Sequence, residues 1–109
     1  MRRPVLSAAW AATLLSPSNA SLHYLLAESL SRLGRHEDAI ASRVRAIEGG
    51  LDGVRAWFLL AGDYVGVGDT VAEIAAVDSA GARAGSPQEH DAVEQARLAL
   101  GSNTDSNEL

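Results

Sequence analysis

Residues 21–34, SLHYLLAESLSRLG, contain the pattern that decides the fold. The main apolar side chains in this stretch are Leu22, Leu25, Leu26, Leu30 and Leu33. These leucines recur at intervals of three and four residues, which is the period of one face of an α-helix. Gly34 follows, and glycine readily adopts the left-handed backbone that ends many helices. The stretch therefore predicts an amphipathic helix over about residues 19–33.

The rest of the chain shows further helical segments separated by turn residues. Ser86-Pro87-Gln88-Glu89 reads as a capping box with proline at the first helical position, which would open the last helix. Asp52 and Thr70 are the predicted starting caps of two earlier helices. We therefore predict an all-α chain with helices at about residues 3–15, 19–33, 36–48, 53–66, 70–84 and 87–100.

An internal repeat becomes visible when the sequence is shifted against itself by 34 residues. Residue character is then kept at glycine, aliphatic, aromatic and small positions together, which chance rarely achieves. The aligned pairs include Gly34 with Gly68, Leu26 with Leu60, Tyr24 with Phe58, Ile40 with Ile74, Ala27 with Ala61, and Ala46 with Ala80. We expect the alanines to let paired helices approach closely, while the larger side chains fill the seam between them.

The composition excludes several kinds of site. Apolar residues make up 47% of the 109 residues and charged residues 21%, as in a globular protein. Cysteine is absent, which rules out disulfides and thiolate metal ligands. The net charge of −5 argues against binding to duplex nucleic acid, which needs a basic surface.

Residues 20–84 resemble the tetratricopeptide repeat (TPR) family, whose unit is a 34-residue helix–turn–helix. Residues 57–64, WFLLAGDY, follow the Trp, Leu, small residue and Tyr series of that family. The first copy follows the same series at Leu26, Ala27, Leu30, Gly34, Ala39 and Ala46. It departs from the family pattern at His23, where Trp is usual, at Arg43, where a large aromatic is usual, and at Leu51, where proline is usual.

The resemblance implies a short right-handed α-solenoid of antiparallel helix–turn–helix repeats. About two repeats would be preceded by a truncated half-repeat and followed by a capping helix at residues 87–100. We expect a single domain over residues 1–100 and a disordered polar tail over residues 101–109.

The first twenty residues allow two interpretations. Arg2 and Arg3 precede an apolar run, and Ser18-Asn19-Ala20 resembles a cleavage site, so a secretory signal at about residues 1–20 is one of them. In the other, residues 3–15 form the second helix of the half-repeat, because Leu6 falls on Ile40 when the repeat is continued backwards. The second interpretation predicts a cytoplasmic protein, and the first a secreted or periplasmic one. The exposed apolar side chains on this helix, Leu6, Trp10 and Leu14, would favour self-association into a homo-oligomer.

The sequence contains little that suggests chemistry. His23, His36 and His90 are dispersed and lack the spacing of metal ligands, so we predict packing for the first and solvation for the other two. Gly62, Gly66 and Gly68 follow no strand and precede no lysine, unlike a phosphate-binding loop. We therefore expect no catalytic residues, no metal and no cofactor, and a chain that is not an enzyme.

The resemblance to the TPR family implies a scaffold or protein-binding function, because the first helix of each repeat in that family lines a concave groove. The residues placed on that face are Tyr24, Glu28, Arg32, Arg55, Phe58 and Gly62. The expected partner is a protein or peptide, with no role for nucleic acid or a membrane. Alternatives are a repeat-region fragment of a larger bacterial regulator or of a carbohydrate-modifying or sulfotransferase-like enzyme, and a small exported helical protein. Tyr24 and Phe58 could instead pack between neighbouring helices.

Overall fold

The computed structural model describes residues 18–108, with side chains up to residue 101. Its helices are α2 (Ala20–Arg32), α3 (His36–Glu48), α4 (Val54–Val67), α5 (Thr70–Arg83) and α6 (Pro87–Glu108). No strand occurs in this part of the chain, so the all-α prediction is confirmed there. The predicted helix at residues 3–15, with Leu6, Trp10 and Leu14, lies outside the described residues.

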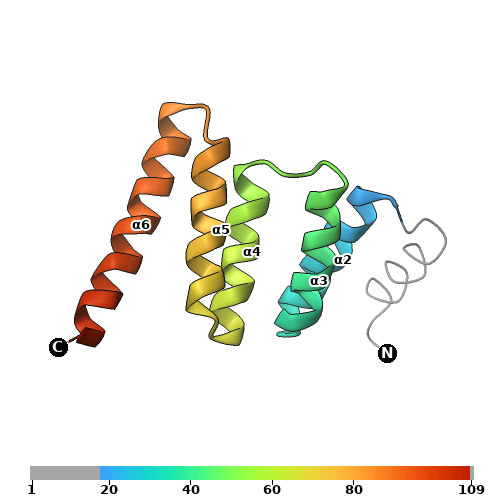
Figure 1. Cartoon of the computed structure of the whole chain (residues 1–109). Helices are drawn as coiled ribbons and strands as arrows, with labels where there is room; N and C mark the ends of the chain where they lie inside the picture. The colour runs from blue at the N-terminus through green and yellow to red at the C-terminus, as the bar shows by residue number, and fades with distance from the viewer. Residues whose placement is uncertain (1–17, 109) are drawn as a thin grey trace.

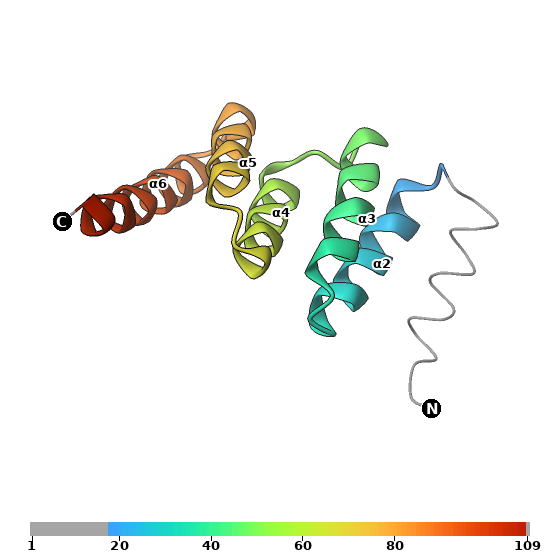
Figure 2. The same cartoon turned by 60° about the horizontal axis from the view of Figure 1, so that its bottom comes forward.

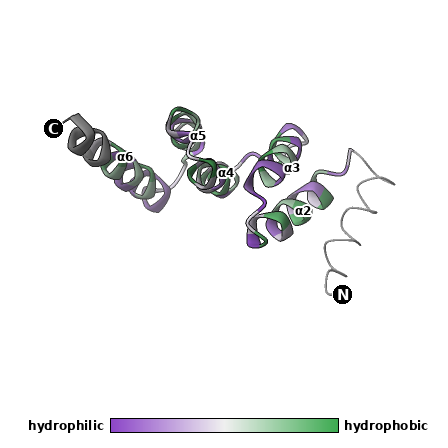
Figure 3. Ribbon diagram, turned by 90° about the horizontal axis from the view of Figure 1, so that it is seen from below, coloured by the Kyte–Doolittle hydropathy of each residue, from purple (hydrophilic) through white to green (hydrophobic). Residues whose placement is uncertain are grey.

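The helices form two antiparallel pairs, α2 with α3 and α4 with α5, followed by α6 (Figure 1). Each helix packs mainly on its neighbour in the sequence. Seen along the helices, α2 lies below α3 and α4 lies below α5 (Figure 3). The last helix diverges from α5 toward its C-terminal end in two different views (Figures 1 and 2).

The turns of the two pairs have the same geometry at positions 34 residues apart. Gly34 and Gly68 have φ angles of +78° and +77°. Only glycine adopts such angles without strain, which explains its presence at both positions. Beyond each glycine, a backbone N–H reaches back to end the helix: Arg35 donates to the Leu30 carbonyl at 2.9 Å, and Asp69 donates to the Tyr64 carbonyl at 3.0 Å.

Two separate apolar cores stabilise the pairs. Leu26, Leu30 and Ala39 form the first, between α2 and α3. The second, between α4, α5 and α6, contains Val54, Ala61, Ala76, Val77, Ala80 and Val93. The alanines expected at close helix contacts are buried, with Ala27, Ala46 and Ala80 at 0% exposure and Ala61 at 6%. Small side chains therefore allow the close approach that the sequence pattern predicted.

The residues that cap the helices match those predicted from the sequence only in part. The predicted cap at the start of α6 is confirmed in part: Glu89 N–H donates to Ser86 Oγ at 3.1 Å, but the Glu89 carboxylate accepts from Gly85 N–H at 2.8 Å instead of from Ser86. Two predicted caps were wrong. Gly53, rather than Asp52, precedes α4, and Asp69, rather than Thr70, caps α5 by accepting from Ala72 N–H at 3.0 Å. At the start of α5, the Asp69 side chain reaches the free N–H groups of the first turn as well as a Thr70 side chain would. Spacing alone therefore did not distinguish Asp69 from Thr70.

Asp52 and the end of α6 have other arrangements than those predicted. The Asp52 carboxylate pairs with Arg83 at 3.3 Å, and the Arg83 guanidinium lies 5.4 Å from the centre of the Trp57 ring. These contacts fasten the start of α4 to the end of α5. The last helix runs to Glu108, beyond the predicted end near residue 100.

Candidate functional site

The six residues predicted to line a partner-binding groove belong to α2 and α4, the first helix of each pair. Tyr24, Glu28 and Arg32 belong to α2, and Arg55, Phe58 and Gly62 belong to α4. Arg55 Nε donates a hydrogen bond to the Tyr24 hydroxyl oxygen at 3.3 Å, so the two helices are joined at this point. This bond is the main reason that the pKa of Arg55 is raised above its ordinary value. The guanidinium therefore keeps its charge at any physiological pH.

The other four residues differ in how much of each is open to solvent. Arg32 and Gly62 are exposed. Phe58 is partly buried and packs against the second apolar core. The Glu28 side chain is 30% exposed and accepts a hydrogen bond from Arg43 at 3.4 Å. Of the six predicted residues, Arg32, Arg55 and Gly62 are exposed and Tyr24 is partly exposed, and we call these four the α2–α4 face.

A narrow recess lies beside the contact between Tyr24 and Arg55. Its lining consists of Tyr24, Arg43, Ala46 and Ala56, and it has no room for a water molecule. Arg43 is 3% exposed, and its Nη1 has no hydrogen-bond partner among the described residues. The recess is therefore too small to hold a ligand, but it carries one unused donor below the α2–α4 face.

A buried ionic cluster, which the sequence analysis did not predict, connects the two helix pairs. Its members are Glu28 and Ser31 from α2, His36 and Arg43 from α3, and Asp63 from α4. Asp63 Oδ1 accepts hydrogen bonds from Ser31 Oγ and from His36 Nδ1, both at 2.9 Å. Asp63 Oδ2 accepts from Arg43 Nε at 2.5 Å. One carboxylate thus fastens α4 to both helices of the first pair.

Because this cluster is buried, each of its charges is stabilised by an opposite charge of the same cluster. Asp63 is 1% exposed and Arg43 is 3% exposed, so neither charge is stabilised by water. A buried ion is tolerated only when an opposite charge and hydrogen bonds replace its hydration. Arg43 and Asp63 meet this condition for each other. The cluster therefore adds a buried ionic contact to the joint between the pairs.

The cluster contains a serine, a histidine and an aspartate, but not in an arrangement that activates a nucleophile. In a catalytic triad the serine hydroxyl donates to a histidine nitrogen, which is in turn oriented by the carboxylate. Here the Ser31 hydroxyl and the His36 ring both donate to the same oxygen of Asp63. These bonds therefore do not place the His36 ring where it could take the proton of the Ser31 hydroxyl. The arrangement holds helices together.

The position of His36 differs from the prediction that it is solvated. Its side chain is 30% exposed, and the ring lies against the backbone of Gly66 on α4. A Cβ atom at Gly66 would lie 2.5 Å from His36 Cγ and Cδ2. The absence of a side chain at Gly66 thus provides the space in which His36 reaches Asp63. The sequence did not reveal this because the two residues are far apart along the chain.

A pair of alanine substitutions tests this close contact. Gly62→Ala should stabilise the protein by about 0.5–1 kcal/mol, because a Cβ there meets nothing within 4 Å and alanine favours a helix. Gly66→Ala offers the same gain but displaces the His36 ring, so we expect a net loss of about 1–2 kcal/mol. Urea unfolding followed by circular dichroism measures both. Equal changes in the two variants would show that His36 does not pack on Gly66.

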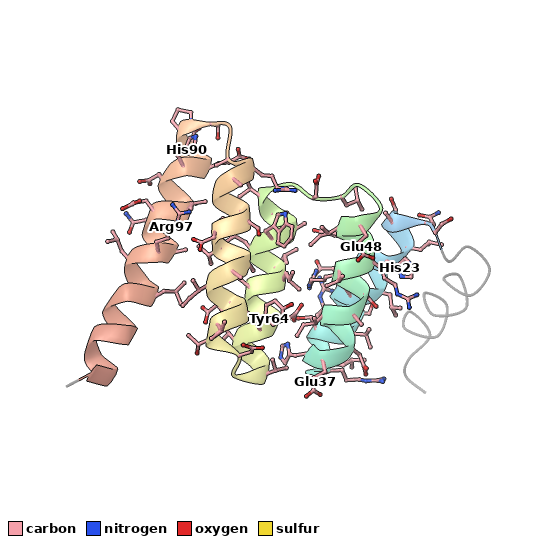
Figure 4. All side chains as sticks on the ribbon, viewed as in Figure 1. His23, Glu37, Glu48, Tyr64, His90 and Arg97 are labelled. Carbon is pink, nitrogen blue, oxygen red and sulfur yellow. The ribbon has the colours of Figure 1, made fainter. Side chains whose placement is uncertain are left out.

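The remaining histidines do not approach the cluster. His23 is buried in α2, as expected for a packing residue, whereas His90 is exposed near the start of α6 (Figure 4). Across residues 18–101, no three histidine, aspartate or glutamate side chains gather in a way that could hold a metal ion. Within the described part of the chain, no helix combines the length and the apolar character needed to cross a membrane.

No protein-family model and no curated protein sequence matches this chain. The resemblance to the TPR family therefore depends on the sequence pattern quoted above.

Proposed function

We propose that this chain is a protein-binding module of the TPR type, without catalytic activity, and that the α2–α4 face receives the partner. The repeated geometry supports the proposed family. Gly34 and Gly68 occupy the same place in each pair, with nearly equal φ angles. The same carbonyl-to-amide bond closes the helix before each of them. These are the features expected of a repeat unit that is used twice.

The observation that carries the proposal is the contact between Tyr24 and Arg55. These residues lie 31 positions apart, on the first helix of each pair, and their side chains meet at the surface. Hydrogen bonds from Arg55 to Tyr24 and from Ser31 to Asp63 link the two first helices, so a partner that contacts one of them can reach the other. Aromatic and arginine side chains are also the residue types that contribute most to binding at protein interfaces.

Reversing the charge of Arg55 tests this function. Arg55→Glu should weaken partner capture about tenfold, because Arg55 is exposed on the proposed surface and is bonded there to Tyr24. The melting temperature should stay nearly unchanged, because exposed substitutions have little effect on stability. The measurement is affinity capture from a lysate of the source cells, with quantification of each co-purified protein, combined with thermal unfolding.

The matched control is Arg45→Glu, which makes the same charge change at an exposed position of α3. A partner whose capture falls with Arg55→Glu but not with Arg45→Glu supports the proposal. Equal capture by the wild type and both variants would contradict it, as would a loss of capture that parallels a loss of folded protein.

A further inference from the structure

The loop that joins α3 to α4 (Figure 1) contains the one aspartate of the sequence that glycine follows, in the pair Asp52-Gly53. Glycine has no Cβ and its backbone moves freely, so its nitrogen can approach the side chain of the preceding residue. When that side chain is an aspartate, the nitrogen can attack the carboxyl carbon and close a five-membered imide. The pair is therefore the place in the sequence where an aspartate isomerises most easily.

The structure leaves this pair open to such a movement. Neither residue belongs to a helix, and Gly53 is exposed. A Cβ atom at Gly53 would meet nothing within 4 Å, so no neighbour obstructs the backbone there. The Asp52 side chain is 48% exposed. Gly49 and Gly50 precede it in the same loop, which leaves few side chains to hold the backbone in place.

An ion pair with Arg83 restrains the Asp52 carboxylate. Nη2 and Nε of Arg83 lie 3.3 Å and 3.4 Å from Oδ2 of Asp52. These distances are long for a charge-assisted hydrogen bond, and the Arg83 side chain is 41% exposed. A surface ion pair of this kind contributes little and opens readily, because water solvates both ions. The pair holds the carboxylate toward α5, and its opening frees the carboxyl group to meet the nitrogen of Gly53.

We propose that Asp52 is a site of spontaneous isomerisation to isoaspartate and that Arg83 slows the reaction. First, the backbone nitrogen of Gly53 forms a bond to Cγ of the protonated carboxyl group, and the carboxyl hydroxyl leaves with the amide hydrogen as water. A water molecule then adds to one carbonyl carbon of the imide and breaks its bond to the nitrogen. Addition at Cγ restores aspartate, whereas addition at the main-chain carbonyl carbon leaves isoaspartate. The water released equals the water consumed, so the mass is unchanged and no other reactant is needed.

The product loses contacts that fasten the start of α4. Isoaspartate adds one methylene group to the main chain and leaves its carboxylate directly on Cα, with a shorter reach toward Arg83. The carbonyl of Asp52, which accepts from Trp57 Nε1 at 3.1 Å, becomes part of that carboxylate. Both bonds of Asp52 to its neighbours therefore change in the isomer. This site does not depend on the proposed binding function.

The test stores the intact chain at neutral pH and physiological temperature, then digests it with trypsin and separates the peptides by liquid chromatography with mass spectrometry. Cleavage after Arg45 and Arg55 releases residues 46–55, AIEGGLDGVR, which contain the pair. Isoaspartate appears as a second peak of the same mass, and methylation by isoaspartyl methyltransferase identifies it. The variants are Gly53→Ala, whose backbone angles of −75° and 177° suit alanine, and Arg83→Gln.

Asp69 provides a control within the same chain. Its side chain accepts from Ala72 N–H at 3.0 Å, and the branched Thr70 follows it. Both features keep the next nitrogen away from the carboxyl carbon, so Asp69 should not isomerise. Because unfolding would expose both aspartates, Asp69 also reports whether a variant isomerises only because it has lost structure.

We expect the second peak to grow in the wild type, to be absent in Gly53→Ala, and to grow about two- to threefold faster in Arg83→Gln. A wild type without the second peak would overturn the site, as would an equal peak in Gly53→Ala. Equal rates in the wild type and Arg83→Gln would overturn the restraint by Arg83, as would a rise in Arg83→Gln that Asp69 shares.

Discussion

Replacement of Asp63 with alanine is expected to lower the free energy of unfolding by about 3–5 kcal/mol, enough to unfold much of a small domain. Within the described part of the chain, Asp63 is the acceptor for the Ser31 hydroxyl and for Nε of Arg43. Its removal leaves the Arg43 charge buried at 3% exposure with only the distant Glu28 contact at 3.4 Å. Urea unfolding monitored by circular dichroism gives the change in free energy.

The control for this prediction is the double variant Arg43→Met with Asp63→Leu. Replacing both ions of a buried pair with apolar side chains is often neutral or stabilising, because the cost of desolvation disappears with the charges. We therefore expect the double variant to be far more stable than Asp63→Ala. A loss of less than about 1 kcal/mol in Asp63→Ala would show that the cluster is open to water. A double variant as unstable as Asp63→Ala would show that stability is lost through altered packing and not through the unpaired Arg43 charge.

Leu30→Ala should have the second-largest effect, a loss of about 3 kcal/mol. Leu30 is 1% exposed and lies at the centre of the small first core, beside Leu26 and Ala39. Its truncation removes buried apolar surface and leaves a cavity that so few neighbours cannot fill. The measurement is again urea unfolding.

Leu25 on the same helix provides the control. It is 49% exposed, so Leu25→Ala removes the same atoms from a position that has little packing to lose. We expect a change below about 1 kcal/mol for this variant. Similar losses in Leu25→Ala and Leu30→Ala would mean that α2 does not present to α3 the face that the structure shows.

The sequence predicted the helices because their apolar residues have a clear period and their ends carry glycine or proline. Leu26 and Leu30 marked the buried side of α2, and Gly34 and Gly68 marked the turns. These are local signals that need no knowledge of distant contacts. Thr70 was wrongly chosen as a cap because the neighbouring Asp69 can satisfy the same free N–H groups, and Asp52 was wrong because α4 begins after Gly53, which makes no side-chain cap bond.

The ionic cluster escaped prediction because its contacts connect residues 15 or more positions apart. Arg43 was noted only as a departure from the family pattern. One signal was nevertheless present: Arg43 lies between the apolar faces of Ala39 and Ala46, and Asp63 lies beside Leu60. A charge on an apolar helix face requires an opposite charge nearby. Two such residues of opposite sign could have been paired before the structure was known.

The cluster also affects how the proposed binding face is held. Glu28 lies on that face and contacts Arg43, while Asp63 follows Gly62 directly on α4. The relative position of α2 and α4, and therefore of Tyr24 and Arg55, depends in part on this buried ionic joint. Loss of Asp63 should consequently disturb binding as well as stability.

The most direct test of a binding function on the α2–α4 face is amide chemical-shift mapping by NMR of the ¹⁵N-labelled chain. The partner to add is a protein that the wild type captures and Arg55→Glu does not. We predict that the largest shift changes occur at Tyr24, Arg32, Arg55 and Gly62, with small changes at exposed positions of α3 and α5 such as Arg45 and Val71. Shift changes concentrated on α3 and α5, with the α2–α4 face unaffected, would contradict the proposed function.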